Sequence, residues 1–353
     1  MASRRSSAWA TLVLFMVVPL AQGGEEEGGA VLRRGTLFLS TSLVGYMNNL
    51  EYFNAYRQGV LHLGTNVTLR ALYRPVEGVA FSLGGFARKA AGDGRLLSDA
   101  RFLPSVRFRR GVFTLTMGEL DATGRHGLPD AVVREQYEYE KGFEEGFSLR
   151  WEWPLVGWEL WMVCDSLNTA RHREHLRFGS VTRFASGMLH ARLMGYWDHY
   201  GGQLHAPQGD PVRDNWTGGV RAGVAVPVAR ILDRAGLDVT ALGSSTTQER
   251  NRIDYVRGWV AMMQARLERN RFELLWHTSY GNRFIAWQGN PLYGAPGFWH
   301  ALQLSRSAPL APGLMLDWGV RADVVDLPLT RWAERADHQV WIRIGSSQER
   351  LLY

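Results

Sequence analysis

The chain has 353 residues, enough for one large or two ordinary domains, of which 46% are hydrophobic, 12% aromatic and 21% charged. Its mean hydropathy of −0.19 excludes a protein built from membrane-spanning helices, and the single cysteine, Cys164, excludes an intrachain disulfide. The formal net charge is +6, but the arginines are spread along the chain rather than clustered, which argues against nucleic acid as a partner.

The N-terminus has the pattern of an export signal. Arg4 and Arg5 precede an almost wholly apolar run over residues 8–20, and Ala21, Gln22 and Gly23 follow it. A basic start, a short apolar core and small residues near a cleavage point are typical of a secretory signal peptide. We therefore predict a signal peptide at 1–23, followed by a short leader at 24–34.

Alternation of apolar and polar residues runs through the rest of the chain. In residues 61–73 apolar side chains fall mostly at odd positions, whereas His62, Asn66 and Arg70 fall at even ones. Successive side chains of a strand point to opposite faces, so this period indicates strands with one apolar face. In chain order we predict strands near residues 37–43, 61–73, 79–86, 106–109, 113–117, 147–153, 158–164 (apolar on both faces), 176–184, 189–197, 220–226, 237–241, 259–267, 272–276, 298–304, 314–322 and 340–344.

Residues 256–280 contain the clearest pair of strands. Apolar residues share one face over 259–267, and the pattern resumes over 272–276 after a polar reversal. Each arm has about ten residues, which is the length that a tilted strand needs to cross a bilayer. The alternative is an amphipathic helix, because Ala, Met, Gln, Arg and Leu are good helix formers.

The connections between the predicted strands alternate between short and long. Reversals of roughly three to nine residues separate strands two and three, four and five, and each later pair, while the intervening loops are long and polar. Short turns at one rim, long loops at the other and tryptophans near strand ends are typical of a bacterial outer-membrane barrel. We therefore predict an all-β fold: a transmembrane antiparallel β-barrel of about 16 strands (range 14–18) over residues 35–353. The alternative is a secreted all-β protein of two packed sheets.

These features resemble those of the bacterial outer-membrane porin-like family. Residues 118–153 and 199–205 are similar to segments of porin-like proteins, whereas the stretch at 345–353 departs from the clean alternating strand with which such barrels end. The resemblance implies an outer-membrane location, with both termini in the periplasm and outer-membrane lipid as a partner. It also implies passive diffusion of small hydrophilic solutes, and it leaves a homotrimer open.

Arginine dominates the predicted inner face. Rings of arginine favour anions, so one interpretation is an anion-preferring channel; the other is a solvated wall of paired charges. The candidates to line a pore are Arg70, Arg107, Arg109, Arg150, Arg192, Arg266 and Arg321. Because the third long loop of general porins folds inward, the resemblance also implies a constriction loop at 121–146; the alternative is an exposed loop. The candidates on this loop are Asp121, Arg125, His126, Asp130, Arg134 and Glu135.

Grounds for catalysis are weak in the sequence. His277 and Ser279 lie two apart on one predicted strand, but a nucleophile and its base also need a third, orienting group. His199 and His205 have no Cys or acidic partner at metal-ligand spacing. We therefore predict that the chain is not an enzyme and that it binds no metal or cofactor. Two alternatives to a channel are a barrel that binds or assembles surface polysaccharide and a barrel hydrolase.

Overall fold

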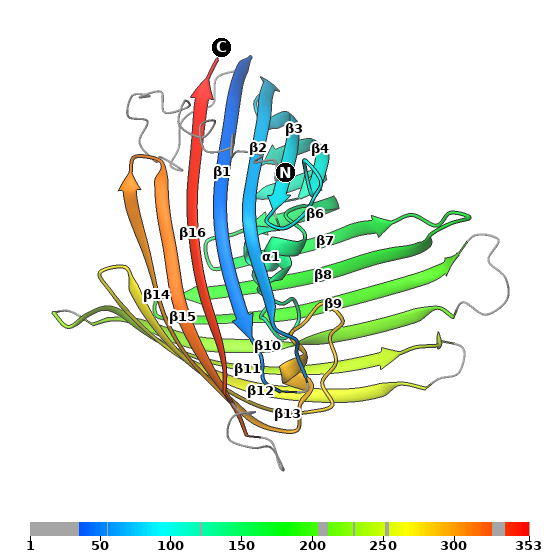
Figure 1. The fold of residues 1–353 in the computed structure, drawn as a ribbon. Helices are drawn as coiled ribbons and strands as arrows, with labels where there is room; N and C mark the ends of the chain where they lie inside the picture. The colour runs from blue at the N-terminus through cyan, green and yellow to red at the C-terminus, as the bar shows by residue number, and fades with distance from the viewer. Residues whose placement is uncertain are drawn as a thin grey trace, which may run out of the picture. The chain divides into compact units, whose positions relative to one another are not determined.

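In the computed structural model, sixteen antiparallel strands close into a barrel (Figure 1). The structure describes residues 35–54, 56–120, 122–203, 211–228, 230–250, 254–326 and 336–352, so the predicted signal peptide and leader lie outside the described residues. The strands are β1 (Thr36–Glu51), β2 (Val60–Val76), β3 (Val79–Ala90), β4 (Asp99–Arg110), β5 (Phe113–Leu120), β6 (Glu144–Glu152), β7 (Val156–Ser166), β8 (Arg173–Ser186), β9 (Leu189–Gln203), β10 (Arg213–Val228), β11 (Leu232–Thr247), β12 (Val256–Arg269), β13 (Phe272–Asn282), β14 (Gly297–Ala311), β15 (Leu314–Asp326) and β16 (Ala336–Leu351). The predicted all-β antiparallel barrel of about 16 strands is confirmed.

The barrel closes between its first and last strands. β1 pairs with β2 on one side and with β16 on the other, so the blue and red strands lie side by side in Figure 1. The ladder between β1 and β16 runs from Phe38 opposite Leu351 to Glu51 opposite His338. The C-terminal stretch is therefore a full partner in the sheet, although its sequence alternates poorly. Closure removes the unpaired strand edges that lipid could not satisfy.

The apolar faces of the strands point outward. Leu83, Leu193 and Val220 are 56%, 55% and 52% exposed on the outer surface. On β12, Trp259 faces outward with 46% of its surface exposed, whereas its neighbour Val260 faces the lumen and is 1% exposed. A continuous apolar surface of this kind is stable against lipid rather than water, so the outer face of the barrel is the membrane-contacting face.

The stretch at 256–280 forms the predicted hairpin, and the alternative helix is wrong. β12 and β13 are joined by Asn270 and Arg271, whose φ angles are 49° and 68°. Two central residues with positive φ give a turn whose twist matches that of the flanking strands. The apolar period of two therefore outweighs the helix propensity of the individual residues.

Short turns and long loops lie at opposite rims, as predicted. β1 begins and β16 ends at the short-turn rim, where the β2–β3 turn contains Gly78. Gly78 has a φ of 75°, and a Cβ atom there would lie 2.2 Å from the carbonyl oxygen of Arg109, so this turn requires glycine. The longest connection is the third at the long-loop rim, between β5 and β6.

Residues 122–143 of this connection fold into the barrel, and we call them the plug. The plug contains a 3₁₀ turn, η1 (Thr123–Gly127), and a single helical turn, α1 (Tyr137–Glu140), which lies within the ring of strands in Figure 1. Val132 and Tyr137 of the plug are 1% and 3% exposed. No helix in the described ranges is both long enough and apolar enough to span a membrane.

The plug packs against apolar side chains of the inner wall. Trp161 and Val163 on β7 are each 1% exposed and belong to the same buried cluster as the plug. Residues 158–164 have apolar residues on both faces because one face contacts lipid and the other contacts the plug, with Glu159 as the charged residue of the inner face. The loop at 283–296, which includes η3 (Pro291–Gly294), packs into this cluster as well. The inner face is therefore a mixture of apolar packing and charged groups.

Candidate functional site

His126 of the plug lies between two glutamates of the wall, an arrangement that we call the His126 clamp. Its Nε2 is 2.9 Å from Glu144 Oε2, its Nδ1 is 2.9 Å from Glu159 Oε1, and its ring stacks on Trp161 with centroids 4.2 Å apart. Both nitrogens can donate only when the ring is protonated. Burial lowers the pKa of His126, but the hydrogen bonds to the two glutamates outweigh it and raise this pKa above its ordinary value.

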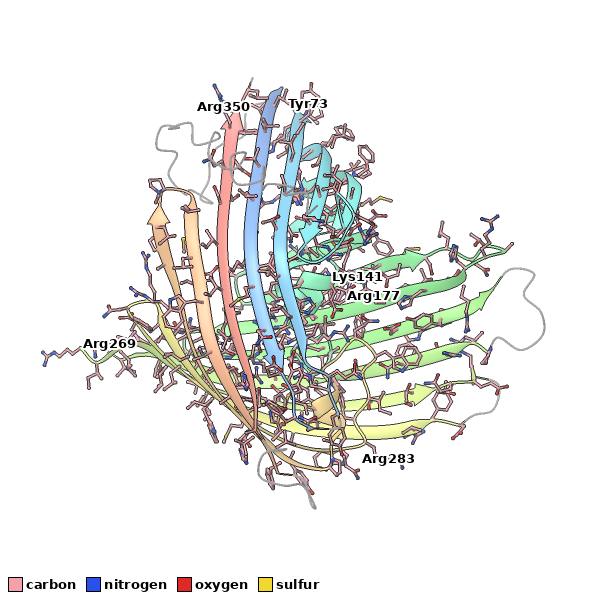
Figure 2. The ribbon with its side chains drawn as sticks, viewed as in Figure 1. Tyr73, Lys141, Arg177, Arg269, Arg283 and Arg350 are labelled. Carbon is pink, nitrogen blue, oxygen red and sulfur yellow. The ribbon has the colours of Figure 1, made fainter. Side chains whose placement is uncertain are left out.

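Arginines of the wall neutralise the two glutamates of the clamp. Arg150 and Arg183 pair with Glu159 at 2.9 and 3.1 Å, and Arg177 pairs with Glu144 at 2.7 Å. Figure 2 shows Arg177 inside the barrel, where its side chain is 2% exposed. Removing one partner from such a buried network leaves an uncompensated charge, so these residues hold the plug in place.

The backbone of the plug is also anchored by arginines. Arg125 and His126 have φ angles of 54° and 53°, a left-handed conformation that costs about 1–2 kcal/mol per residue. Arg183 donates to the carbonyl oxygen of His126, and Arg192 donates to that of Gly127, each at 3.1 Å. These bonds compensate for the backbone strain.

The other predicted loop residues connect the plug to the loop at 283–296. Asp130 accepts hydrogen bonds from the side chain of Asn290 at 2.6 Å and from the backbone of Glu135 at 2.8 Å. The backbone N–H of Arg134 donates to the same loop at 2.8 Å. Burial raises the pKa of Asp130, but nearby guanidinium groups outweigh it and lower this pKa. Asp121 lies outside the described residues.

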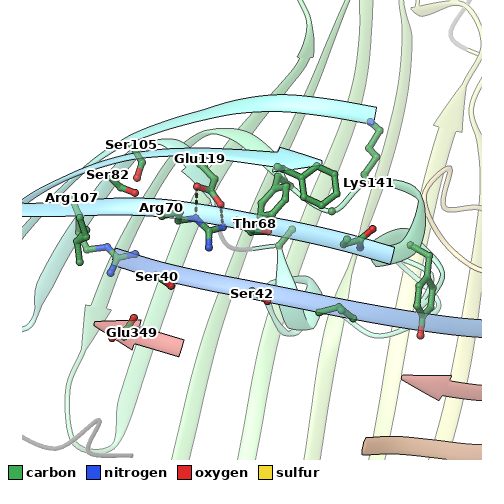
Figure 3. A pocket seen from close by; sticks show the side chains of 18 of the residues that line it. Ser40, Ser42, Thr68, Arg70, Ser82, Ser105, Arg107, Glu119, Lys141 and Glu349 are labelled. Carbon is green, nitrogen blue, oxygen red and sulfur yellow. Dashed lines mark hydrogen bonds and ion pairs between the residues drawn. The ribbon is translucent and has the colours of Figure 1, made fainter. Parts of the chain in front are cut away.

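The seven arginines predicted to line a pore occupy inner-facing positions with different surroundings. Arg70 and Arg107 line a cavity in the lumen (Figure 3), and Arg109 lies on the same face of β4, nearer the short-turn rim. The remaining four bind the plug or an acidic residue: Arg150, Arg192, Arg266 and Arg321.

A different polar cluster lies on the outer surface at the long-loop rim. We call Glu174, His199, Asp214 and Arg250 the rim site. Odd-numbered positions of β9 face lipid, as the exposed Leu193 indicates, and the same phase places His199 on the outside. Asp214 is directly opposite His199 in the ladder between β9 and β10. The rim site therefore combines side chains from three neighbouring strands and one loop.

Asp214 holds the imidazole of His199 in one orientation. The Nδ1–H of His199 donates to Asp214 Oδ1 at 2.9 Å, and Arg250 binds both oxygens of this carboxylate at 2.6 and 2.7 Å. The side chain of Asp214 is 2% exposed, compared with 12% for His199 and 45% for Arg250. His199 Nε2 is 3.9 Å from Glu174 Oε1, which is too long for a hydrogen bond. Nε2 therefore keeps a free lone pair, and this atom can accept a proton from a molecule on the lipid side.

Aromatic rings lie next to the rim site, one step nearer the middle of the membrane. Trp197 stacks between Phe178 and Trp216, with centroid distances of 5.0 and 4.7 Å, and its Nε1 donates to Asp214 at 2.9 Å. Trp216 is 50% exposed on the outer surface. Tryptophans of membrane proteins gather at the level of the lipid headgroups, so the rim site lies at headgroup depth.

Two other histidines have aspartate partners, but on the inner face. His190 Nε2 is 2.6 Å from Asp238 Oδ1, and His175 Nε2 is 2.7 Å from Asp198 Oδ1. In the described part of the chain, the lipid-facing His–Asp pair is the one that contains His199. This outward placement distinguishes the rim site chemically, because a lipid can reach it without entering the barrel.

The histidine and serine considered in the sequence lie elsewhere. His277 and Ser279 face the lumen with 2% and 5% of their surfaces exposed, and His277 packs between Tyr293 and Trp299. The rim site was missed because its members are brought together only by strand pairing. One signal was available: His199 is a polar residue in the lipid-facing phase of a strand, where an apolar residue is expected.

A model of the family described as lipid A 3'-O-deacylase-type matches residues 29–310. Among solved structures, the chain is similar to Pseudomonas aeruginosa OprD (TM-score 0.53, 11% identity, 91% of this chain and 97% of that chain covered). It is also similar to an anion-selective porin from Comamonas acidovorans (0.55, 13%, 88% and 100%) and to Vibrio cholerae OmpT in a trimer form (0.52, 9%, 90% and 100%). Comparison with curated proteins finds no match.

The closed barrel and its structural neighbours show that the chain has the fold of a porin-like β-barrel. The family match spans most of the chain, so the chain belongs to the lipid A 3'-O-deacylase-type family. The prediction that the chain is not an enzyme is wrong, because the description of this family names an enzymatic activity. Groups close together in one strand can be recognised in a sequence, whereas His199 and its partner Asp214 are 15 residues apart and meet only through strand pairing.

Proposed function

We propose that the protein hydrolyses an acyl ester of lipid A, with the rim site as its catalytic centre. The observation that carries this proposal is the hydrogen bond from His199 to Asp214 on the lipid-facing surface, which leaves a basic Nε2 open at headgroup depth. Membership of the lipid A 3'-O-deacylase-type family supports the substrate class. Lipid A is an acylated and phosphorylated sugar, and its esters join the sugar headgroup to the acyl chains. These esters therefore lie near headgroup depth, where the tryptophans place the rim site.

Water is the nucleophile in this proposal. His199 Nε2 takes a proton from water as the water oxygen attacks the carbonyl carbon of the ester, and Asp214 stabilises the imidazolium that forms. The bond between the acyl carbon and the sugar oxygen then breaks, and His199 returns the proton to that oxygen. The products are a free fatty acid and a sugar hydroxyl.

Arg250 and Trp216 act as positioning residues in the same proposal. One edge of the Arg250 guanidinium binds Asp214, while 45% of the side chain is exposed and faces the level of the headgroups. A guanidinium is well suited to bind a phosphate of the lipid. Trp216 offers an apolar surface to an acyl chain beside the ester.

The test is the release of fatty acid from lipid A. The full chain is refolded into vesicles that contain lipid A, and mass spectrometry follows the loss of one acyl group. We expect His199→Gln to lower the rate about 10²- to 10⁴-fold, because it removes the general base. His190→Gln is the matched control, since His190 has an aspartate partner on the inner face. Wild-type protein without deacylation, or equal losses in both variants, would contradict the proposal.

Outer-membrane location and export are part of this proposal. A substrate in the outer membrane requires the barrel to reside there, and the predicted signal peptide at 1–23 supplies the route. N-terminal sequencing of the mature protein from an outer-membrane fraction tests both points. A homotrimer stays a prediction, and chemical cross-linking in native membranes tests it.

Passage of small hydrophilic solutes is the second candidate function. A cavity of about 470 Å³ in the lumen favours it, because the lining includes more basic than acidic side chains and fits a preference for anions. In planar bilayers, steady ohmic openings whose reversal potential follows the anion gradient would support this function. Persistent silence would exclude it and leave deacylation untouched.

A further inference from the structure

The lumenal cavity is bounded by β1–β5, β16 and residues 139–143 of the plug (Figure 3). Its volume of about 470 Å³ falls in the range of sites for small molecules. No residue of the rim site lines it. The cavity is therefore a separate place at which a ligand can be recognised.

Hydroxyl groups gather on the inner wall of this cavity. Ser82 and Ser105 are direct partners in the ladder between β3 and β4, and Ser42 and Thr68 are partners between β1 and β2. All four line the cavity, as Figure 3 shows. Each hydroxyl can donate one hydrogen bond and rotate to suit an acceptor, so this wall is suited to bind oxygen atoms of a ligand.

Arg107 is a guanidinium in the cavity for which the described residues supply no partner. Arg70 is held by Glu119, with Nε 3.1 Å from Oε2, and Lys141 is held by an aspartate at 2.7 Å. Arg107, in contrast, forms no hydrogen bond or ion pair within the described part of the chain. It lies two positions from Ser105 on the same face of β4, so a free guanidinium adjoins the serine wall.

Arg70 is held against the wall by its surroundings. A Cβ atom at Gly84 would lie 2.7 Å from Cγ of Arg70, so the glycine allows this side chain to cross β3 and reach Glu119. On the same wall, Asn66 has a buried Oδ1 with no hydrogen-bond partner among the described residues. As far as the described ranges extend, the cavity therefore presents a cationic donor at Arg107 and an acceptor at Asn66 that no other protein group uses.

We infer that the cavity binds a small organic anion that also carries hydroxyl or amino groups. Its carboxylate or phosphate pairs with Arg107 and accepts from Ser82 and Ser105, while a hydroxyl or amino group donates to Asn66. Guanidinium and hydroxyl donors together match the geometry of such oxyanions. This inference does not depend on lipid A hydrolysis, because it uses the inner face of the barrel alone.

Isothermal titration of the folded barrel in detergent tests the inference. The probes are gluconate, glucose 6-phosphate and uncharged glucose, in 0.3 M salt so that long-range attraction is screened. We expect saturable binding of one or both anions and none of glucose. Arg107→Gln should weaken binding about tenfold or more, because it removes a charge-assisted pair. Arg109→Gln is the matched control on the same strand and face, and it should change affinity less than about twofold.

Three results would overturn the inference. One is the absence of saturable binding of either anion to the wild-type barrel. Another is an equal loss in the Arg107→Gln and Arg109→Gln variants, which would mean non-specific attraction to a basic lumen. The third is binding of glucose with the same affinity as the anions. Heat-modifiable migration on a gel verifies that each variant is folded.

Discussion

His126 and His199 are both flanked by carboxylates, but on opposite sides of the same barrel wall. His126 uses both ring nitrogens, each 2.9 Å from a glutamate, and is 7% exposed inside the lumen. His199 uses one nitrogen for Asp214 and keeps the other open on the lipid-facing surface. A histidine with both nitrogens bound holds structure together, whereas one with a free, oriented nitrogen can move a proton.

Asp214→Asn should cause the largest change on the outer side of this comparison. We expect kcat for lipid A deacylation to fall about 10³- to 10⁴-fold, because an amide cannot stabilise the imidazolium of His199. The measurement is the rate of fatty acid release at saturating lipid A. Asp238→Asn is the control, as Asp238 binds His190 on the inner face. Similar losses in both variants would mean that outward placement is irrelevant to the reaction.

His126→Leu should cause the largest change on the inner side. The substitution leaves two buried glutamates without their shared donor, so we expect the free energy of unfolding to fall by about 3–5 kcal/mol. Urea unfolding in lipid vesicles measures it. His199→Leu should cost only about 1 kcal/mol, because Arg250 and Trp197 still donate to Asp214 after the histidine is lost. Equal losses in the free energy of unfolding would contradict the idea that His126 holds the structure together and His199 does not.

The His126 clamp should also weaken as pH rises. Folding raises the pKa of His126, so its contribution to stability is complete below the unfolded value of about 6.5. The contribution is lost as pH increases through the raised folded value. We therefore expect the difference in urea midpoint between wild type and His126→Leu to shrink from pH 6 to pH 9. A constant difference would show that the clamp does not require the imidazolium.

Trp216→Ala should have the smallest effect, and it separates lipid binding from chemistry. Loss of the exposed ring should raise KM about three- to tenfold with kcat unchanged, because the ring contacts substrate equally before and during reaction. Trp318→Ala on β15 is the control, as this tryptophan faces outward on a strand that contributes nothing to the rim site. A fall in kcat instead would assign Trp216 a role in orienting Asp214 through Trp197.

The sites were harder to predict than the fold. The length and the position of the loop that carries His126 and Asp130 are visible in the sequence. They do not decide whether this loop folds into the barrel or stays exposed. Its apolar residues, which include Val132 and Tyr137, do not predict a plug without knowledge of the wall that they meet. Trp161 and Val163 supply that wall from another strand. The rim site required still more, because Glu174, His199, Asp214 and Arg250 come from four separate segments.

The sequence by itself determined the strand period, the alternation of short turns with long loops and the division of side chains between lipid and lumen. These properties are local, because each depends on residues within one strand or one connection. Only the tertiary structure decided which arginines hold a plug, which one faces an open cavity and which histidine acquires an aspartate on the membrane side. Those outcomes depend on register between strands, and register is set by barrel closure and packing across many residues at once.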